Sequence, residues 1–160
     1  MSSVIIEYSF IAVVLLIFSY SLFSVVQREH ELSVALCAAR SGANLATTMN
    51  NYAVYPTISF DNYTEFKPEL LSPSATKIIK IEYKFKGYNE RYKKFEIELQ
   101  VYAHVNRLFN NHSLRSLGDR INYNVRKSIC EVFGTGDKYE YYDPAFSQNF
   151  VFITPEVKWV

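Results

Sequence analysis

The chain has 160 residues, which is enough for one compact domain of ordinary size. Its 17 Lys and Arg residues and 16 Asp and Glu residues give a formal net charge of +1, which argues against a histone-like nucleic-acid binder and a disordered polyelectrolyte. Apolar residues make up 49% of the chain, so a packed core is easily supplied. Five Gly, five Pro and two Cys exclude collagen-like, low-complexity and disulfide-dense scaffolds.

The N-terminal segment is continuously apolar. Twenty consecutive residues, from Tyr8 to Gln27, carry no formal charge, and as a helix they would span about 30 Å, the thickness of a bilayer's hydrocarbon core. A domain of this size rarely buries twenty residues on every face, so we predict a membrane-compatible helix rather than a core helix. A cleavable secretory signal would have a shorter apolar region after a basic one, and no Lys or Arg precedes Arg28.

The helical pattern continues beyond the apolar segment. Apolar residues recur at spacings of four and three, at Leu32, Leu36, Ala39, Ala43 and Ala46. No residue that would end a helix occurs before Tyr52 or Pro56. We therefore predict one helix of more than forty residues within residues 1–50, apolar in its first half and amphipathic in its second.

Small residues follow one another along the second half of this predicted helix. Ala35, Ala39 and Ala43 form one row, and Ala38, Gly42 and Ala46 form another. Such rows let helices of neighbouring chains approach closely. They fit equally well a helix that packs on the sheet of its own chain, and both arrangements can hold at once.

Glu7 stands near the start of the apolar span. A carboxylate there costs about 2.5 kcal/mol or more unless it is paired or lies near the membrane interface. Glu7 therefore either marks the membrane edge or finds a positive partner, for which a free amino terminus on an adjacent subunit is the obvious candidate.

The N-terminal part of the sequence has four segments in order. They are a short N-terminal piece, Ile-Glu-Tyr at residues 6–8, an unbroken apolar run, and an Ala-rich amphipathic stretch that ends in ALCAARSGANLA. This layout resembles the N-terminal helix of type IV pilin-like proteins, including archaeal pilins with class III signal sequences and TadE-like pseudopilins. The resemblance covers about the first fifty residues. The basic residue and glycine that normally precede the cleavage point in these families are missing. If Ser3 were the first mature residue, Glu7 would be the fifth, as in the family.

The resemblance implies assembly through the N-terminal helix. The protein would rest in a membrane before assembly and then join copies of itself in an extracellular helical filament on the cell surface, a type IV pilus or archaeal pilus. The residues expected to carry assembly are Glu7, Tyr8, Ile11, Leu15, Phe18, Leu22, Ala35, Ala39 and Ala43.

The remaining residues predict a linker and a β-rich head. Residues 51–76 contain three prolines and read as a linker, with a short edge strand at 57–60. Strict alternation of apolar and polar residues at 79–85 and 94–105 predicts two half-buried strands, joined near Gly87 into an antiparallel hairpin. Residues 121–132 favour a helix ending at Gly134 over a strand, and 139–142, 150–154 and 157–160 favour short strands.

The expected fold class is therefore α+β, with a long N-terminal helix packed on a C-terminal antiparallel head at residues 77–160. The amphipathic face of the helix would cover the apolar face of the sheet.

No motif for catalysis, metal binding or cofactor binding stands out. The three histidines lack zinc-ligand spacing, and Gly-Thr-Gly at 134–136 lacks the rest of a phosphate-binding fingerprint. We therefore expect no enzyme, no cofactor and no small-molecule substrate.

Residues 77–94 are basic, with seven Lys and Arg against two Glu, and three tyrosines lie among them. The stretch is either a contact for DNA, anionic lipid or acidic glycan, or a solvated strand face whose lysines discourage edge pairing.

Asn62 and Asn111 stand in N-glycosylation sequons, which would suit a glycoprotein with an exposed head. Cys37 and Cys130 are either bridged, in an oxidising exterior, or two buried thiols.

The sequence thus predicts a structural pilin-like subunit that serves adhesion, attachment or motility. The alternative is a single-pass membrane-anchored ectodomain that acts as an accessory or binding protein of a surface appendage and does not polymerise.

Overall fold

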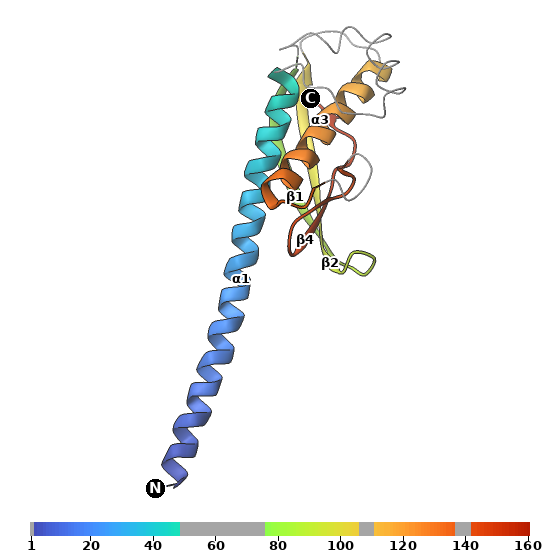
Figure 1. Ribbon diagram of the computed structural model, residues 1–160. Coiled ribbons are helices and arrows are strands. Elements are labelled where there is room, and N and C mark those ends of the chain that lie inside the picture. The colour runs from blue at the N-terminus through green and yellow to red at the C-terminus, as the bar shows by residue number, and fades with distance from the viewer. Residues whose placement is uncertain (1, 49–75, 106–110, 137–141) are drawn as a thin grey trace. The chain divides into compact units, whose positions relative to one another are not determined.

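The computed structural model describes residues 2–48, 76–105, 111–136 and 142–160. The elements in chain order are α1 (Ser2–Thr48), β1 (Thr76–Asn89), β2 (Lys94–Val105), α3 (Asn111–Phe133), β3 (Ala145–Phe146), β4 (Phe150–Ile153) and β5 (Lys158–Trp159) (Figure 1). The predicted α+β class is confirmed. The predicted strand at 57–60, the linker at 51–76 apart from its last residue, and most of the predicted strand at 139–142 lie outside the described residues.

The long helix forms as predicted, since α1 runs for 47 residues without a break. The chain nevertheless divides into two compact units, Met1–Ser33 and Val34–Val160. We call the second the head unit. Its first element is the C-terminal part of α1, from Val34 to Thr48.

The β-hairpin is confirmed. β1 and β2 pair antiparallel from Thr76 opposite Val105 to Asn89 opposite Lys94. At the turn, the Asn89 side-chain oxygen accepts hydrogen bonds from the backbone N–H groups of Arg91 and Tyr92, at 3.0 and 3.3 Å. An asparagine that bonds the backbone a few residues ahead stabilises a turn, which explains why the chain reverses after Asn89.

The sheet has five strands and mixed direction. Its order is β1-β2-β4-β3, and β5 also pairs with β2. The β1–β2 and β3–β4 pairs are antiparallel, whereas β4 and β5 run parallel to β2. Parallel neighbours need a crossover connection, and α3 lies in the chain between β2 and β4. The head was predicted to be antiparallel, and the sheet differs in that β4 and β5 run in the same direction as β2.

The core lies on one face of β2. Alternate residues on that strand are almost completely buried, namely Ile97, Leu99, Val101 and Ala103. β1 follows the same alternation but buries only Ile81 on this face, while Ile79, Tyr83 and Phe85 remain about half exposed. β1 is the edge strand, and its register shifts between Ile78 and Lys80, which leaves Ile79 out of the pairing. One face of β2 thus supplies more of the core than the edge strand does.

The second helix, α3, confirms the helical interpretation of residues 121–132. Gly134 ends it with a φ of 60°, and the Gly134 and Thr135 N–H groups bond back to the carbonyls of Glu131 and Cys130. This pair of bonds is the usual arrangement that closes a helix at glycine. Ile121 and Ile129 are fully buried, whereas Val132 is exposed.

Several polar residues of α3 are buried as well, and they bind the C-terminal segment. The Asn122 amide donates to the Pro155 carbonyl at 2.7 Å, and Arg126 donates to the Thr154 hydroxyl. The sequence pattern did not indicate these contacts, because a purely apolar seam was expected to hold the helix.

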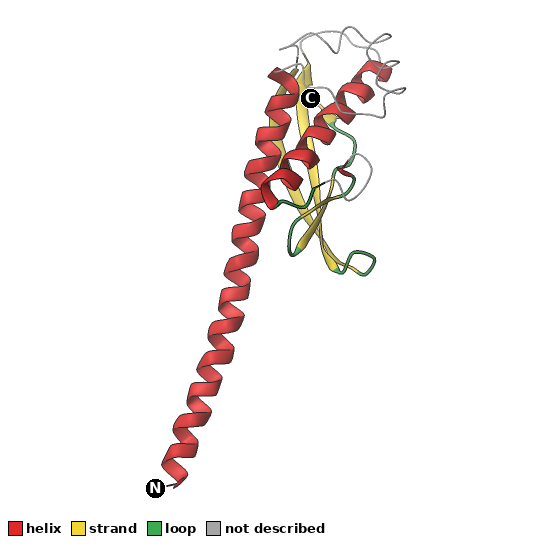
Figure 2. Cartoon of the chain, viewed as in Figure 1, coloured by secondary structure: helices red, strands yellow, loops and turns green. Residues whose placement is uncertain are grey.

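α1 packs closely on α3 within the head unit (Figure 2). A Cβ atom placed on Gly42 would lie 2.6 Å from the Ser128 hydroxyl oxygen and 2.8 Å from the Asn124 carbonyl carbon. Glycine is therefore needed at position 42 for the two helices to approach this closely. The neighbouring positions Ala39, Ala43 and Ala46 are completely buried.

Gly42→Ala should destabilise the head unit by about 1–3 kcal/mol, because the added methyl overpacks the α1–α3 contact. The loss should occur although alanine favours a helix more than glycine does. Ser41→Ala, at an exposed position one residue earlier, is the matched control and should leave the head as stable as before or slightly more stable. Urea unfolding of the detergent-solubilised chain, followed by tryptophan fluorescence, measures the difference. A Gly42→Ala protein as stable as the control would contradict the close contact.

Candidate functional site

The most prominent surface of the described residues is the apolar stretch of α1, residues 6–26. Its large apolar side chains are between 47% and 76% exposed. None of the residues in the most apolar part of the helix is buried. Contiguous apolar surface of this extent marks a contact with protein or membrane.

Two hydroxyl groups within this stretch bond the backbone of their own helix. The Ser21 hydroxyl donates to the Ile17 carbonyl and the Ser24 hydroxyl donates to the Ser21 carbonyl, each at 2.9 Å. The backbone groups of a helix bond one another, and here two side-chain hydroxyls also donate hydrogen bonds to backbone carbonyls of the same helix. The stretch can therefore enter an apolar environment without leaving these two hydroxyl donors unpaired.

α1 is the one helix in the described part of the chain that is long and apolar enough to cross a membrane, judged by length and composition. The segment predicted to be membrane-compatible is thus helical, and its apolar side chains are exposed on the helix surface.

The structure separates the residues that the sequence assigned to assembly. Glu7 and the large residues of the apolar stretch are exposed, namely Tyr8, Ile11, Leu15, Phe18 and Leu22. Ala35, Ala39 and Ala43 are instead fully buried in the head unit. The sequence left two interpretations of the small-residue rows open, packing on the chain's own head or against a neighbouring chain. In this structure the row of Ala35, Ala39 and Ala43 packs within the chain's own head unit. The alanines have no exposed surface left with which to meet another chain.

The two cysteines are free thiols. Cys37 lies exposed on α1 and Cys130 lies buried on α3. The disulfide that the sequence left open is therefore not formed in this structure, and the alternative of two buried thiols holds for Cys130 alone.

Of the two sequons, Asn62 lies outside the described residues, and Asn111 is the first residue of α3. Whether either carries a glycan stays a prediction.

Charged partners offset part of the basic character of the hairpin. Lys80 pairs with Glu82 and Lys86 pairs with Glu98, each at 2.6 Å. Lys94 donates to the backbone carbonyls of Ser147 and Gln148. The hydrogen bond between Lys80 and Glu82 raises the pKa of the lysine and lowers the pKa of the carboxyl. Three of the seven basic residues thus have partners within the head, and a contact of the hairpin with DNA, anionic lipid or acidic glycan stays a prediction.

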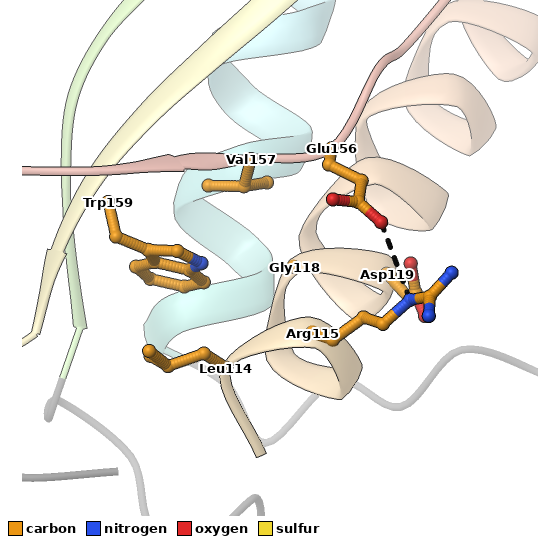
Figure 3. Close-up of a pocket in the computed structure, with 7 residues that line it drawn as sticks. All are labelled: Leu114, Arg115, Gly118, Asp119, Glu156, Val157 and Trp159. Atoms are coloured by element: carbon orange, nitrogen blue, oxygen red, sulfur yellow. Dashed lines mark ion pairs between the residues drawn. The ribbon is translucent and has the colours of Figure 1, made fainter. Parts of the chain in front are cut away.

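A hollow of about 300 Å³ opens between α3 and the C-terminal segment (Figure 3). Its lining includes the indole of Trp159 and an exposed ion pair, in which Arg115 Nε lies 3.4 Å from Glu156 Oε1. A second hollow of about 310 Å³ shares Arg115, Asp119 and Glu156 with the first and also reaches Asn122.

No pattern in the sequence indicated these hollows. Arg115 and Glu156 lie far apart in the chain and meet only because the segment before β5 is bound to α3. A single Trp in an otherwise Tyr- and Phe-rich chain was the only available hint.

The described residues contain no group of three His, Cys, Asp or Glu side chains that could hold a metal ion. Two of the carboxylates around the hollows pair with arginines, Glu156 with Arg115 and Asp143 with Arg126. The most extensive functional surface is the apolar stretch.

Comparison with known proteins adds no assignment, because no family model, no curated protein and no solved structure matches the chain. The likeness to pilin-like proteins therefore rests on the N-terminal sequence layout alone and stays a prediction.

The cysteine arrangement predicts selective thiol labelling. In the folded chain a maleimide should modify Cys37 rapidly and leave Cys130 unmodified, since only the first thiol is exposed. Both should react in denaturant. Mass spectrometry counts the labels, and Cys37→Ser should abolish labelling of the folded form. If neither thiol reacted in denaturant until a reductant was added, the two would be bridged and the free-thiol assignment would be wrong.

Proposed function

We propose that the protein is a structural subunit that polymerises through its N-terminal helix into an extracellular filament. The observation that supports this most directly is the exposure of the apolar stretch of α1, residues 6–26, whose side chains are not covered by their own chain. The order of Glu7, apolar run and Ala-rich half, which resembles pilin-like proteins, supports the same proposal.

The apolar stretch is more stable in a bilayer or in a filament than in water. In water its exposed surface is costly, whereas in a bilayer the surface meets lipid tails. In a filament the same surface would be buried helix against helix. At about 25 cal/mol per Å², several hundred Å² of buried apolar area contribute on the order of 10 kcal/mol per subunit. A contact that repeats without closing yields a helical filament rather than a ring.

Glu7 would set the register of this assembly. A carboxylate inside an apolar bundle needs a positive partner, and the amino terminus of an adjacent subunit would supply one. The pairing would fix how far one helix is shifted along another, because only one shift brings the two charges together. Adhesion, attachment or motility would follow from the filament.

A single-pass membrane-anchored ectodomain is the second candidate. The burial of Ala35, Ala39 and Ala43 in the head unit favours it, because those rows no longer offer a close-packing surface to a neighbouring helix. In that case the apolar stretch would stay in lipid and the head would act as an accessory or binding module.

Shearing intact cells separates the two candidates. We expect the sheared supernatant to contain filaments visible by electron microscopy and composed of this chain by mass spectrometry, because subunits held helix to helix leave the cell together. Retention of the chain in the membrane fraction, without filaments, would establish the anchor instead. A cytosolic protein followed in the same fractions controls for lysis.

Glu7→Gln tests the register. Replacing the carboxylate with an amide removes the charge-assisted pairing and should reduce filament yield on the order of tenfold, while membrane insertion persists because the apolar stretch is intact. Glu29→Gln, the same change at an exposed site beyond the apolar stretch, is the matched control and should assemble normally. Quantitative blotting of sheared and membrane fractions reports both. Normal filaments from Glu7→Gln would show that Glu7 only marks the membrane edge.

A further inference from the structure

The two adjoining hollows of the head unit combine features that a single class of ligand would use. They lie between α3 and the segment from Thr154 to Trp159 and together offer an aromatic surface, charged groups of both signs and a buried amide. Figure 3 shows the first hollow, with Trp159 and Leu114 on one side and the Arg115–Glu156 pair on the other.

A buried hydrogen-bond acceptor in the second hollow is unsatisfied. Asn122 is 4% exposed, and its Nδ2 group donates to the Pro155 carbonyl at 2.7 Å. A carbonyl can only accept, so this bond fixes the orientation of the amide. Asn122 Oδ1 is then left without a donor among the described residues. A buried acceptor in this state costs free energy. Asn122 Oδ1 has almost no accessible surface, so the amide belongs to the wall of the hollow and a ligand does not contact this oxygen directly.

Charges of both signs surround the hollows, two arginines and three carboxylates. Arg115 lies 3.4 Å from Glu156, and Arg126 lies 4.0 Å from Asp143, with Asp119 beside them. Carboxylates would repel a phosphate or sulfate, and arginines would repel a metal ion. A neutral ligand with many hydroxyls can instead donate to the carboxylates and accept from the guanidinium groups.

Trp159 supplies the apolar part of the site. It is the only tryptophan of the chain, is partly exposed and lies next to Gly118. A Cβ atom placed on Gly118 would be 3.3 Å from Val157 Cβ and 3.7 Å from an indole carbon, so Val157 packs tightly against this part of α3 and the ring lies at ordinary contact distance beside it. An indole beside polar groups suits a ligand that is apolar on one face and polar at its rim.

We propose that these hollows form a saccharide-binding site on the head, in which a neutral pyranose stacks on Trp159 and its hydroxyls bond Arg115, Asp119 and Glu156. The apolar C–H face and the equatorial hydroxyl rim of a pyranose match the two kinds of surface. The hollows are open, so the dissociation constant is on the order of 1 mM for a single sugar chain. This site does not depend on filament assembly.

The saccharide can come from two sources. One is a free glycan on another surface. The other is the chain's own N-linked glycan at Asn111, because α3 begins at that residue, within one helical turn of Leu114 and Arg115. Both use the same chemistry, and the experiment below distinguishes them.

The free-glycan arm uses the full chain made without glycosylation, in a phosphocholine detergent so that no sugar headgroup competes. Trp159 is the reporter, and chitotetraose, mannotetraose and maltotetraose are the probes. We expect at least one of them to change the tryptophan emission saturably. Asp119→Asn with Glu156→Gln should weaken that binding on the order of tenfold, because each change removes the charge and replaces one of the two acceptor oxygens with a donor NH2 group. Glu131→Gln, on α3 but outside both hollows, is the matched control.

The own-glycan arm uses the chain from its natural host, with occupancy of Asn111 determined by mass spectrometry. If the attached glycan fills the site, Asn111→Gln should make Trp159 more accessible to acrylamide quenching, and the free tetrasaccharides should bind the variant but not the glycosylated chain.

The proposal is overturned if no tetrasaccharide perturbs Trp159 and Asn111→Gln leaves quenching unchanged, since the hollows would then hold only water. It is also overturned if the double variant binds as well as the control. Preferential binding of a heparin fragment would overturn it too, because an anionic ligand points to the lysines of the hairpin rather than to the hollows.

Discussion

The apolar stretch of α1 is the constraint on which the behaviour of the whole protein depends. Its side chains from Ile6 to Val26 are exposed, and the carboxylate of Glu7 stands near their start. Surface of this kind is stable in lipid or against other apolar helices, and it is costly in water. Lipid or other apolar helices would cover this surface and remove that cost.

A single helix meets two different packing requirements. Large side chains project from its N-terminal half, where apolar area is available for lipid or for neighbouring helices. In its C-terminal part, Gly42 and the adjacent alanines allow close approach to α3, and their burial holds the head unit together. The head is thus stabilised by contacts that do not involve the apolar stretch. The apolar stretch and the contacts that hold the head together thus belong to different units of the chain.

The extent to which the sequence predicts this structure depends on how local the governing interactions are. The long helix and the hairpin follow from periodicity over neighbouring residues, and Gly134 marks the end of α3 because only a local backbone conformation is required there. The parallel direction of β4 and β5 is not readable, since it depends on pairing with β2 across more than forty residues. The hollows were missed for the same reason, because polar contacts from Asn122 to the C-terminal segment create them.

These polar contacts also explain why α3 can be both hydrophilic in composition and largely buried. Asn122 and Arg126 use their polar groups to bind the segment that leads to β5, so their burial is compensated by hydrogen bonds rather than avoided. The compensation is incomplete at Asn122 Oδ1, which accepts no hydrogen bond among the described residues, and Asn122 is one of the residues that line a hollow. The apolar stretch of α1, which lipid or other helices would cover, therefore belongs to one unit of the chain. The proposed saccharide site belongs to the other unit, the head. Either can change in sequence without disturbing the packing that supports the other.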